Sequence, residues 1–405
     1  MRIHVVGMGS VGVFVASHLK RALPTSSPVT LLHKTARHAL NARHAGDGWL
    51  TIENQGVALT TYGLEHDVWD EDVSHKNLYP ETPTPVGPDE EIGLYNTPHI
   101  QPPDRSIRSL VVTTKAYSVE NTIQKLMPRL SPASTIVLLQ NGMGLYDQLC
   151  DNLFPDPLSR PHFMIGVNNH GTWLKKHMHT VHAGIGSIKF SIMPDGLGRD
   201  FERSYNAATQ DAKLNLDDII PSSGDDVEGQ RYYSLRYTLQ AFLAAEGLRA
   251  SWIPQHELYL SQLRKLVVNS VINPLTALLG CPNGKILEHE AGRIIAQQVC
   301  REASNVFYAQ WNAERLAAGR GNNESFPTAL HTTALYNEVE RITRITSHNL
   351  SSMLTDIRLQ RPTEIKYLNG YLVERGKRFN VATPTNRMLL GLISLRREIP
   401  LYGLL

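Results

Sequence analysis

Cysteine is scarce in this sequence of 405 residues, which contains only Cys150, Cys281 and Cys300. Three widely separated cysteines cannot all pair in disulfides, and their spacing is unlike that of a structural zinc site. The sequence therefore argues against a small disulfide-stabilised fold. We expect buried thiols in a reducing compartment and predict that the protein is cytoplasmic.

Long apolar runs and an excess of charge of one sign are also missing. No segment approaches the ~20 consecutive apolar residues of a transmembrane helix, and the apolar strand that starts at Ile3 leaves no room for a signal peptide. Lysine and arginine total 40 against 38 acidic residues, so the net charge of +2 creates little field to attract nucleic acid or an anionic membrane. We expect a small-molecule partner, no nucleic acid and no membrane. A homodimer is compatible with the sequence.

Several catalytic motifs are absent too. The sequence has no G-x-S-x-G, H-E-x-x-H or G-K-[ST] pattern, the usual signatures of a hydrolase, a zinc protease and a P-loop enzyme. His177, His179 and His182 lie in an alternating segment and raise the alternative of a metal site. No cysteine or carboxylate stands at a supporting spacing, so we favour a partly exposed strand and predict no metal.

The sequence does contain the pattern of an α/β fold. Short apolar runs without alternation are typical of parallel strands that are covered on both faces. The predicted elements are strands at Arg2–Val6, Val29–Leu32, Ser109–Thr114 and Thr135–Leu139 and helices at Val11–Leu23 and Val119–Leu130. This order predicts a Rossmann-type, doubly wound sheet in the N-terminal part of the chain.

The pattern changes near residue 254 to long helical periodicity, clearest at 258–273, 290–317 and 365–375. We therefore predict a Rossmann-type domain at 1–254 and an all-α C-terminal domain at 255–405. Within the first domain, a proline-rich segment at about 66–106 and an aspartate-rich segment at about 192–232 are interpreted as loop-rich insertions.

A glycine pattern follows the first predicted strand and precedes the first predicted helix. It reads Gly7-Met8-Gly9-Ser10-Val11-Gly12, which is the G-x-G-x-x-G of dinucleotide-binding folds. The first glycine allows a tight turn, the second lets the backbone approach a pyrophosphate, and the third lets helix and strand pack closely. A glycine-rich turn without a ligand is the alternative, but the position between strand and helix favours a dinucleotide site.

The end of the second predicted strand lacks the acidic residue that usually binds the ribose 2′-hydroxyl of NAD. The first acid after the glycine pattern is Asp47, whereas Lys34 and Arg37 stand at the strand end, where they could bind a 2′-phosphate. A solvated basic turn is the alternative interpretation. The pattern favours NADP over NAD.

Four further segments carry a family resemblance. They are Val111–Tyr117 (VVTTKAY), Leu138–Gly144 (LLQNGMG), Lys265–Ala277 (KLVVNSVINPLTA) and Ser351–Arg358 (SSMLTDIR) leading to Thr363–Ile365. In this order they resemble ketopantoate reductase, the 2-dehydropantoate 2-reductase family. The resemblance implies NADPH-dependent reduction of 2-dehydropantoate to (R)-pantoate in pantothenate and coenzyme A biosynthesis. Two alternatives stay open: a reductase of the same fold for another branched or aromatic 2-keto acid, and a noncatalytic NADP-binding regulatory protein.

The resemblance also implies roles for individual residues. Lys265 would be the catalytic acid, which argues against a noncatalytic protein. Cofactor contacts would come from Lys115, Asn141, Thr172 and Glu364 beside the glycine loop, and substrate contacts from Asn141, Lys265, Asn269, Asn273, Asn283 and Ser352. In this sequence Gln140 replaces a histidine that is common before the Asn-Gly loop of the family.

Elementary chemistry supports the role of the lysine. Lys265, Asn269 and Asn273 are spaced by four residues and share one face of a predicted helix, which Pro274 should break or kink. An ammonium group with an ordinary pKa of about 10.4 can polarise a ketone and then donate a proton. Each of these roles has a structural alternative. Lys265 could be a surface lysine whose aliphatic stem covers apolar residues, and Ser352 could be a helix N-cap. Glu364 could lie in the first turn of a helix, where its charge interacts favourably with the helix dipole.

Overall fold

The computed structural model describes residues 1–46, 48–69, 105–205, 213–220, 229–319 and 325–399. The chain forms two compact units. The first contains Met1–Gln140 and Cys150–Gln255, and the second contains Asn141–Leu149 and His256–Leu405. The chain therefore leaves the first unit for nine residues and returns to it before the second unit is completed.

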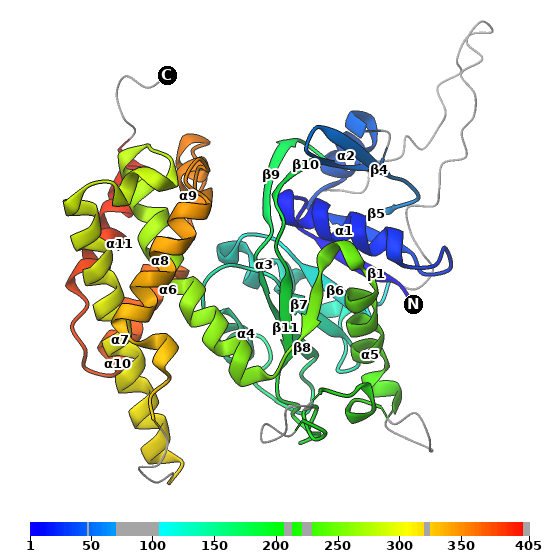
Figure 1. Cartoon of the computed structure of the whole chain (residues 1–405). Coiled ribbons are helices and arrows are strands. Elements are labelled where there is room, and N and C mark those ends of the chain that lie inside the picture. The colour runs from blue at the N-terminus through cyan, green and yellow to red at the C-terminus, as the bar shows by residue number, and fades with distance from the viewer. Residues whose placement is uncertain (47, 70–104, 206–212, 221–228, 320–324, 400–405) are drawn as a thin grey trace, which may run out of the picture. The chain divides into compact units, whose positions relative to one another are not determined.

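The first unit is built on an eight-stranded sheet with the order β12-β11-β8-β7-β6-β1-β2-β5 (Figure 1). Its strands are β1 (Ile3–Val6), β2 (Val29–His33), β5 (Glu65–Val68), β6 (Ser109–Val112), β7 (Thr135–Leu138), β8 (His162–Asn168), β11 (Ile188–Ile192) and β12 (Ala250–Trp252). Only the β8–β11 pair is antiparallel. The predicted Rossmann-type sheet is confirmed, and its strand order reverses at β1, which has β2 on one side and β6 on the other. In such folds ligands bind at this reversal.

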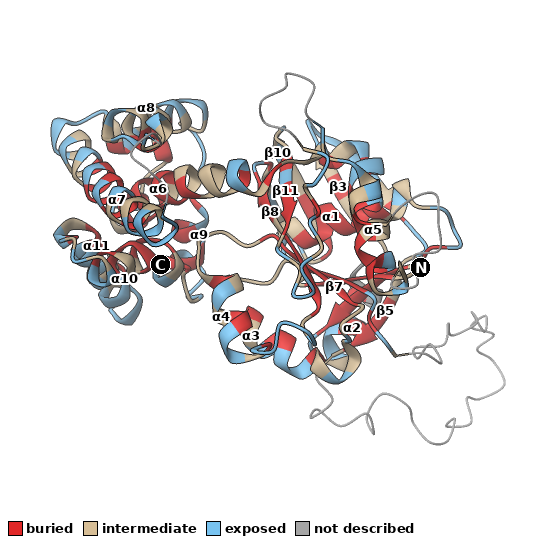
Figure 2. Cartoon of the chain, turned by 90° about the horizontal axis from the view of Figure 1, so that it is seen from below, coloured by how far each residue is buried: buried red, intermediate tan, exposed pale blue. Residues whose placement is uncertain are grey.

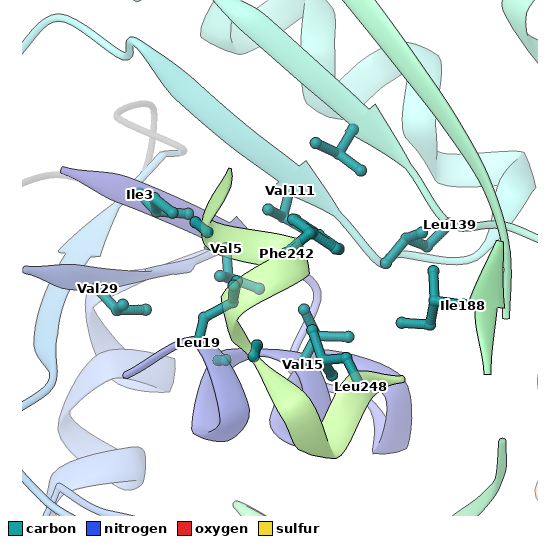
Figure 3. Close-up of a cluster of buried hydrophobic side chains, with 14 of the residues drawn as sticks. Ile3, Val5, Val15, Leu19, Val29, Val111, Leu139, Ile188, Phe242 and Leu248 are labelled. Atoms are coloured by element: carbon teal, nitrogen blue, oxygen red, sulfur yellow. The ribbon is translucent and has the colours of Figure 1, made fainter. Parts of the chain in front are cut away.

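The central strands are buried, and helices pack against them. Every residue of β1, β2, β6 and β7 is buried, and Figure 2 shows the interior of the large sheet around β7 in red. Helix α1 (Ser10–Ala22) packs beside α5 (Gly229–Ala244). Figure 3 shows Val15 and Leu19 of α1 in the same apolar cluster as Val5 of β1 and Phe242 of α5. Burial of these side chains is the main source of stability for the unit.

A second sheet of four strands, in the order β4-β3-β10-β9, also contacts α1. Its strands are β3 (Leu50–Asn54), β4 (Val57–Thr61), β9 (Gly171–Lys176) and β10 (His179–Gly184). The remaining helices that carry residues of this unit are α2 (Ala36–Gly46), α3 (Ala116–Leu126) and part of α4 (Leu145–Asn152). The β9–β10 hairpin turns at Met178, whose φ is 61°.

The two predicted insertions differ from the structure where it describes them. Residues 66–68 of the first belong to β5, a parallel strand of the large sheet, while residues 70–104 lie outside the described part of the chain. In the second, Phe201 and Ile219 are buried in the core of the unit, and residues 206–212 and 221–228 are not described. Runs of proline and aspartate concealed these apolar anchors, since composition averages over single buried residues.

The described part of the second unit is helical, as predicted for the C-terminal domain. Its main helices are α6 (Gln255–Leu279), α7 (Glu290–Ala317), α8 (Thr332–Ile345), α9 (Ser352–Arg358), α10 (Asn369–Arg378) and α11 (Pro384–Glu398). One apolar core joins all six and includes Val267 and Val271 of α6, Val299 of α7 and Leu372 of α10. No helix among the described residues combines the length and apolar character needed to cross a membrane.

Of the two predicted effects of Pro274, a break or a kink, the break does not occur, because α6 continues to Leu279. Proline has no N–H, so the carbonyl of Ser270, four residues earlier, loses its helical donor. The side chain of Asn369 on α10 replaces that donor: its Nδ2 lies 3.0 Å from the Ser270 carbonyl oxygen and 2.9 Å from Oδ1 of Asn386. Asn369 is fully buried, so a tertiary contact repairs the helix.

Replacing Asn369 with alanine is expected to lower the free energy of unfolding by about 2 kcal/mol, because the Ser270 carbonyl is then buried without a donor. Equilibrium urea unfolding would measure this. The exposed Asn349 provides a control, since Asn349→Ala should change stability by no more than about 0.5 kcal/mol. Equal stabilities for the two variants would contradict the repair of the helix by Asn369.

Candidate active site

The glycine turn after β1 has the geometry that each glycine was predicted to provide. Gly7 has a φ of 100°, and a Cβ added there would lie 2.4 Å from the backbone nitrogen of Thr114. A Cβ added to Gly12 would lie 1.9 Å from the carbonyl oxygen of Gly7. Thr113 holds the turn, donating from Oγ1 to the carbonyls of Val6 and Gly7 at 2.9 and 2.7 Å. Backbone contact therefore requires glycine at positions 7 and 12.

Gly9 is different, because no heavy atom lies within 4 Å of the position that its Cβ would take. Gly9 is also the N-cap residue of α1, so it stands where a helix presents unpaired N–H groups. A glycine with open space at a helix N-terminus leaves room for a phosphate to approach the backbone. The turn thus fits the pyrophosphate of a dinucleotide on this structural test.

A pocket of about 480 Å³ in the first unit continues from the glycine turn. It is lined by Val6, Gly7, Met8, Leu32, His33, Lys34, His38, Trp69, Thr114, Tyr117, Ser118, Asn121, Thr122, Lys125 and His177. Among these described lining residues, none is acidic and several are cationic or can become so. The pocket therefore combines apolar and aromatic walls with groups that attract an anion.

The predicted cofactor residues of the first unit fall at different places around this turn. Lys34 lines the pocket, whereas Arg37 is exposed on α2 and is not among the lining residues. Lys115 is the N-cap residue of α3. Ser10 donates from Oγ to the Thr172 carbonyl at 3.3 Å, which places Thr172 of β9 beside the start of α1.

The predicted catalytic face lies in the second unit. Lys265, Asn269 and Asn273 follow one another at intervals of four residues along α6, and Asn273 is only 9% exposed. Burial lowers the pKa of Lys265 from 10.5 to about 8, while the nearby Glu364 carboxylate favours the ammonium and opposes that shift. Lys265 is thus protonated at neutral pH, yet it gives up its proton more readily than a surface lysine.

The loop that contains Asn141 belongs to the same unit as Lys265. Gly142 has a φ of 91°, and an added Cβ would lie 2.6 Å from Cβ of Tyr367. The backbone N–H of Met143 donates to the Tyr367 carbonyl at 3.1 Å. Tyr367 follows three residues after Glu364, so one short turn positions both the Asn141 loop and the carboxylate that acts on Lys265.

The structure distinguishes the two remaining substrate candidates. Asn283 is 6% exposed; its Nδ2 donates to Oγ1 of Thr346 at 3.1 Å, and its Oδ1 has no hydrogen-bond partner among the described residues. Ser352 is exposed as the first residue of α9. The N-cap role considered for Ser352 belongs instead to Ser351, whose Oγ accepts from the N–H of Leu354 at 3.1 Å.

Two side chains hold these loops in place, in roles that the sequence did not predict. Gln140, at the departure from the family pattern, donates from Nε2 to the carbonyls of Val112 and Thr114 at 2.7 and 3.2 Å and so fixes the segment before Lys115. Gln140 and Thr113 lie within the motif segments quoted above, but their positioning roles could not be predicted, because their partners are backbone atoms far away in the sequence.

The histidine segment that suggested a metal site is divided between separate contacts. Nε2 of His179 lies 3.0 Å from the Glu53 carboxylate, which also pairs with Lys175 at 2.7 Å. His182 is hydrogen-bonded to His170 at 3.0 Å. Within the described residues, no group of three or more histidine, cysteine or acidic side chains is arranged to hold a metal ion. Glu53 is a carboxylate partner that spacing along the sequence could not reveal.

Comparison with known families gives two matches that together span most of the chain. Residues 3–195 match the family described as "Ketopantoate reductase PanE/ApbA", and residues 257–397 match "Ketopantoate reductase PanE/ApbA C terminal". Curated proteins with related sequences include a 2-dehydropantoate 2-reductase of Escherichia coli O157:H7, which is 30% identical over 71% of this chain and 74% of its own length. The 2-dehydropantoate 2-reductase of Saccharomyces cerevisiae is 27% identical over 94% of this chain and 89% of its own length.

Solved structures share the fold. A ternary complex of D-mandelate dehydrogenase with NADH and anilino(oxo)acetate has a TM-score of 0.66 at 17% identity, covering 98% of this chain and 99% of that protein. A PanE/ApbA family ketopantoate reductase from Ralstonia eutropha JMP134 has a TM-score of 0.64 at 18% identity with the same coverage. At these identities the two structures bear on the architecture alone.

Proposed function

Because this chain belongs to the ketopantoate reductase PanE/ApbA family, we propose that it catalyses the NADPH-dependent reduction of 2-dehydropantoate to (R)-pantoate, a step of pantothenate and coenzyme A biosynthesis. One observation carries the proposal: Lys265 is half-buried, its pKa is lowered to about 8, and it shares a helix face with Asn269 and Asn273. The pKa of a fully exposed lysine would not be lowered by desolvation in this way.

Ketone reduction needs a hydride at the carbonyl carbon and a proton at the oxygen, where negative charge develops. Bound NADPH supplies the hydride. The Lys265 ammonium polarises the carbonyl and then donates a proton from Nζ to the oxygen. Asn269 and Asn273 offer amide donors and acceptors to the hydroxyl and carboxylate oxygens of a small keto acid.

In this proposal most of the cofactor contacts come from the first unit. The backbone of Gly9 at the N-terminus of α1 receives the pyrophosphate, for which the open space at its Cβ position leaves room. Lys34 in the pocket and Arg37 on α2 supply positive charge for a 2′-phosphate. Lys115, Asn141, Thr172 and Glu364 complete the cofactor contacts, while Asn283 and Ser352 join the substrate contacts.

A substrate panel tests the proposal. Purified protein with NADPH is expected to reduce 2-dehydropantoate with a kcat/KM at least about tenfold above that for other branched keto acids or for phenylglyoxylate, an aromatic one. Consumption of NADPH at 340 nm would measure the rates. Faster turnover of another keto acid would assign the protein to that substrate, and no turnover of any keto acid would leave the noncatalytic NADP-binding alternative.

The cellular location is proposed to be the cytoplasm. Cys150, Cys281 and Cys300 are all free thiols, and Cys150 and Cys300 are buried. Burial raises the pKa of Cys300 to about 12, which keeps it an unreactive thiol. Free thiols are the usual state of cysteine in a reducing compartment.

A further inference from the structure

The pocket beside the glycine turn contains two histidines that the proposed reaction does not use. His38 comes from α2, and His177 reaches the pocket from the turn of the β9–β10 hairpin in the smaller sheet. The two are close enough for the charge of His38 to lower the pKa of His177. Residues from distant parts of the chain thus bring two imidazoles to one pocket.

His177 is the stronger of the two observations. Its Nε2 is buried and has no hydrogen-bond partner among the described residues. Buried polar atoms in native proteins are almost always paired, with protein, water or a ligand. A ligand atom that forms a hydrogen bond with this ring nitrogen would therefore remove the free-energy penalty of leaving it buried and unpaired.

His38 is prepared to donate a hydrogen bond. Its Nδ1 lies 2.9 Å from Oγ1 of Thr35, and that same oxygen accepts from the backbone N–H of His38 at 3.3 Å. If the threonine hydroxyl donates to Nδ1, the neutral ring carries its proton on Nε2. Nε2 is then a donor toward an anion without any change of charge.

The other charged groups of the pocket point to the same ligand. Lys34 and His33 come from the end of β2, and Lys125 comes from α3, so the elements that line the pocket contribute positive or protonatable groups. None of the described lining residues is acidic. The end of the second strand is also where a dinucleotide-binding fold distinguishes NADP from NAD. The chemistry suits a phosphate monoester and disfavours an unmodified ribose.

We propose that His177 and His38 bind the 2′-phosphate of NADP and that this pair, with Lys34, sets the preference for NADPH over NADH. The inference rests on the cofactor assigned above and extends it to a residue of the smaller sheet. Two imidazoles and an ammonium provide several donors for a phosphate, and charged hydrogen bonds of this type are strong. Glutamine at 177 retains a donor but cannot become a cation.

Binding of two ligands that differ only in the 2′-phosphate tests the proposal without catalysis. Isothermal titration with 2′-phospho-ADP-ribose and with ADP-ribose should show that His177→Gln weakens the phosphorylated ligand by about tenfold. Binding of ADP-ribose should change by less than about twofold. The control is Lys176→Gln, which removes an exposed cation from the same hairpin but not from the pocket lining, and which should leave both affinities unchanged.

The outcomes separate this inference from the proposed cofactor. If the unmodified protein binds ADP-ribose as tightly as 2′-phospho-ADP-ribose, the proposed preference for NADPH over NADH is wrong. If it prefers the phosphorylated ligand and His177→Gln preserves that preference, only the role of His177 fails. Equal losses of both ligands in His177→Gln would assign a structural role to the histidine and overturn the inference as well.

The pH dependence gives an independent measurement. Burial, then the charge of His38, lowers the pKa of His177, so the ring is neutral near pH 7 in the free protein. A bound phosphate raises that pKa, so binding takes up a proton and strengthens as pH falls. Between pH 8 and 6.5 the preference for the phosphorylated ligand should increase about threefold or more, with a smaller increase in His177→Gln. Identical pH profiles would overturn the proposal.

Discussion

Replacing Lys265 with methionine is expected to lower kcat by ~10³-fold or more while NADPH still binds with nearly unchanged affinity. Methionine matches the length of the lysine side chain but has no charge and no proton to donate. The transition state then loses both the cation beside the developing alkoxide and the general acid. Each contribution is large because Lys265 is half-buried and partly desolvated, so that water screens its charge less than at the surface.

Steady-state kinetics with NADPH titration would measure this effect. Lys366→Met is the control, because Lys366 is an exposed lysine two residues after Glu364 and its loss should leave kcat within about twofold. A Lys265→Met variant that retains more than a tenth of the activity would show that another group donates the proton. Weak NADPH binding together with low kcat would instead indicate a disrupted fold.

The pH profile follows from the same group. The acid must be protonated, so kcat is expected to fall as pH rises through about 8, the pKa of Lys265. Glu364 favours the ammonium, and Glu364→Gln should therefore move the decline to lower pH. A decline that stays in place in Glu364→Gln would mean that another group controls this limb.

Gly9→Ala is expected to weaken NADPH binding, and Gly12→Ala is expected to destabilise the fold. The added methyl group of Gly9→Ala contacts nothing in the free protein, so the free energy of unfolding should change by less than about 0.5 kcal/mol. The affinity for NADPH should fall by about 100-fold, because the methyl group occupies the space through which the pyrophosphate approaches the backbone. At Gly12 the methyl meets the Gly7 carbonyl, and stability should fall by about 2 to 3 kcal/mol.

Thermal unfolding and fluorescence titration with NADPH distinguish the two variants, and each serves as the control for the other. Both carry the same added methyl group within three residues of one another. If Gly9→Ala binds NADPH normally, the pyrophosphate does not approach this part of the turn. If Gly12→Ala is as stable as the unmodified protein, the helix and strand are not as closely packed as the structure indicates.

The sequence predicted those features that depend on neighbours along the chain. The glycine turn was recognisable because strand, turn and helix all fall within Ile3–Ala22. The shared face of Lys265, Asn269 and Asn273 was recognisable because helical periodicity places residues four apart on one side. In both cases local spacing determines the geometry directly.

Features that depend on tertiary contact were not predicted. The Asn141 loop groups with the second unit because it packs on Tyr367, more than two hundred residues later. The domain boundary near residue 254 stays a prediction. His177 was considered only as a candidate metal ligand or a strand residue, although the fold brings it to a pocket with His38. Contacts at such separations leave no periodic signal in a single sequence.

The proline inside α6 has a consequence for how this chain can evolve. Pro274 removes a backbone donor and Asn369 supplies the replacement. A substitution of either residue alone is therefore expected to lower the stability of the fold. An alanine at 274 would restore the N–H and displace the amide of Asn369 from the Ser270 carbonyl, which would leave Asn386 as its hydrogen-bond partner. Positions 274 and 369 should therefore covary among descendants, and a lineage that loses one would be under selection to exchange the other.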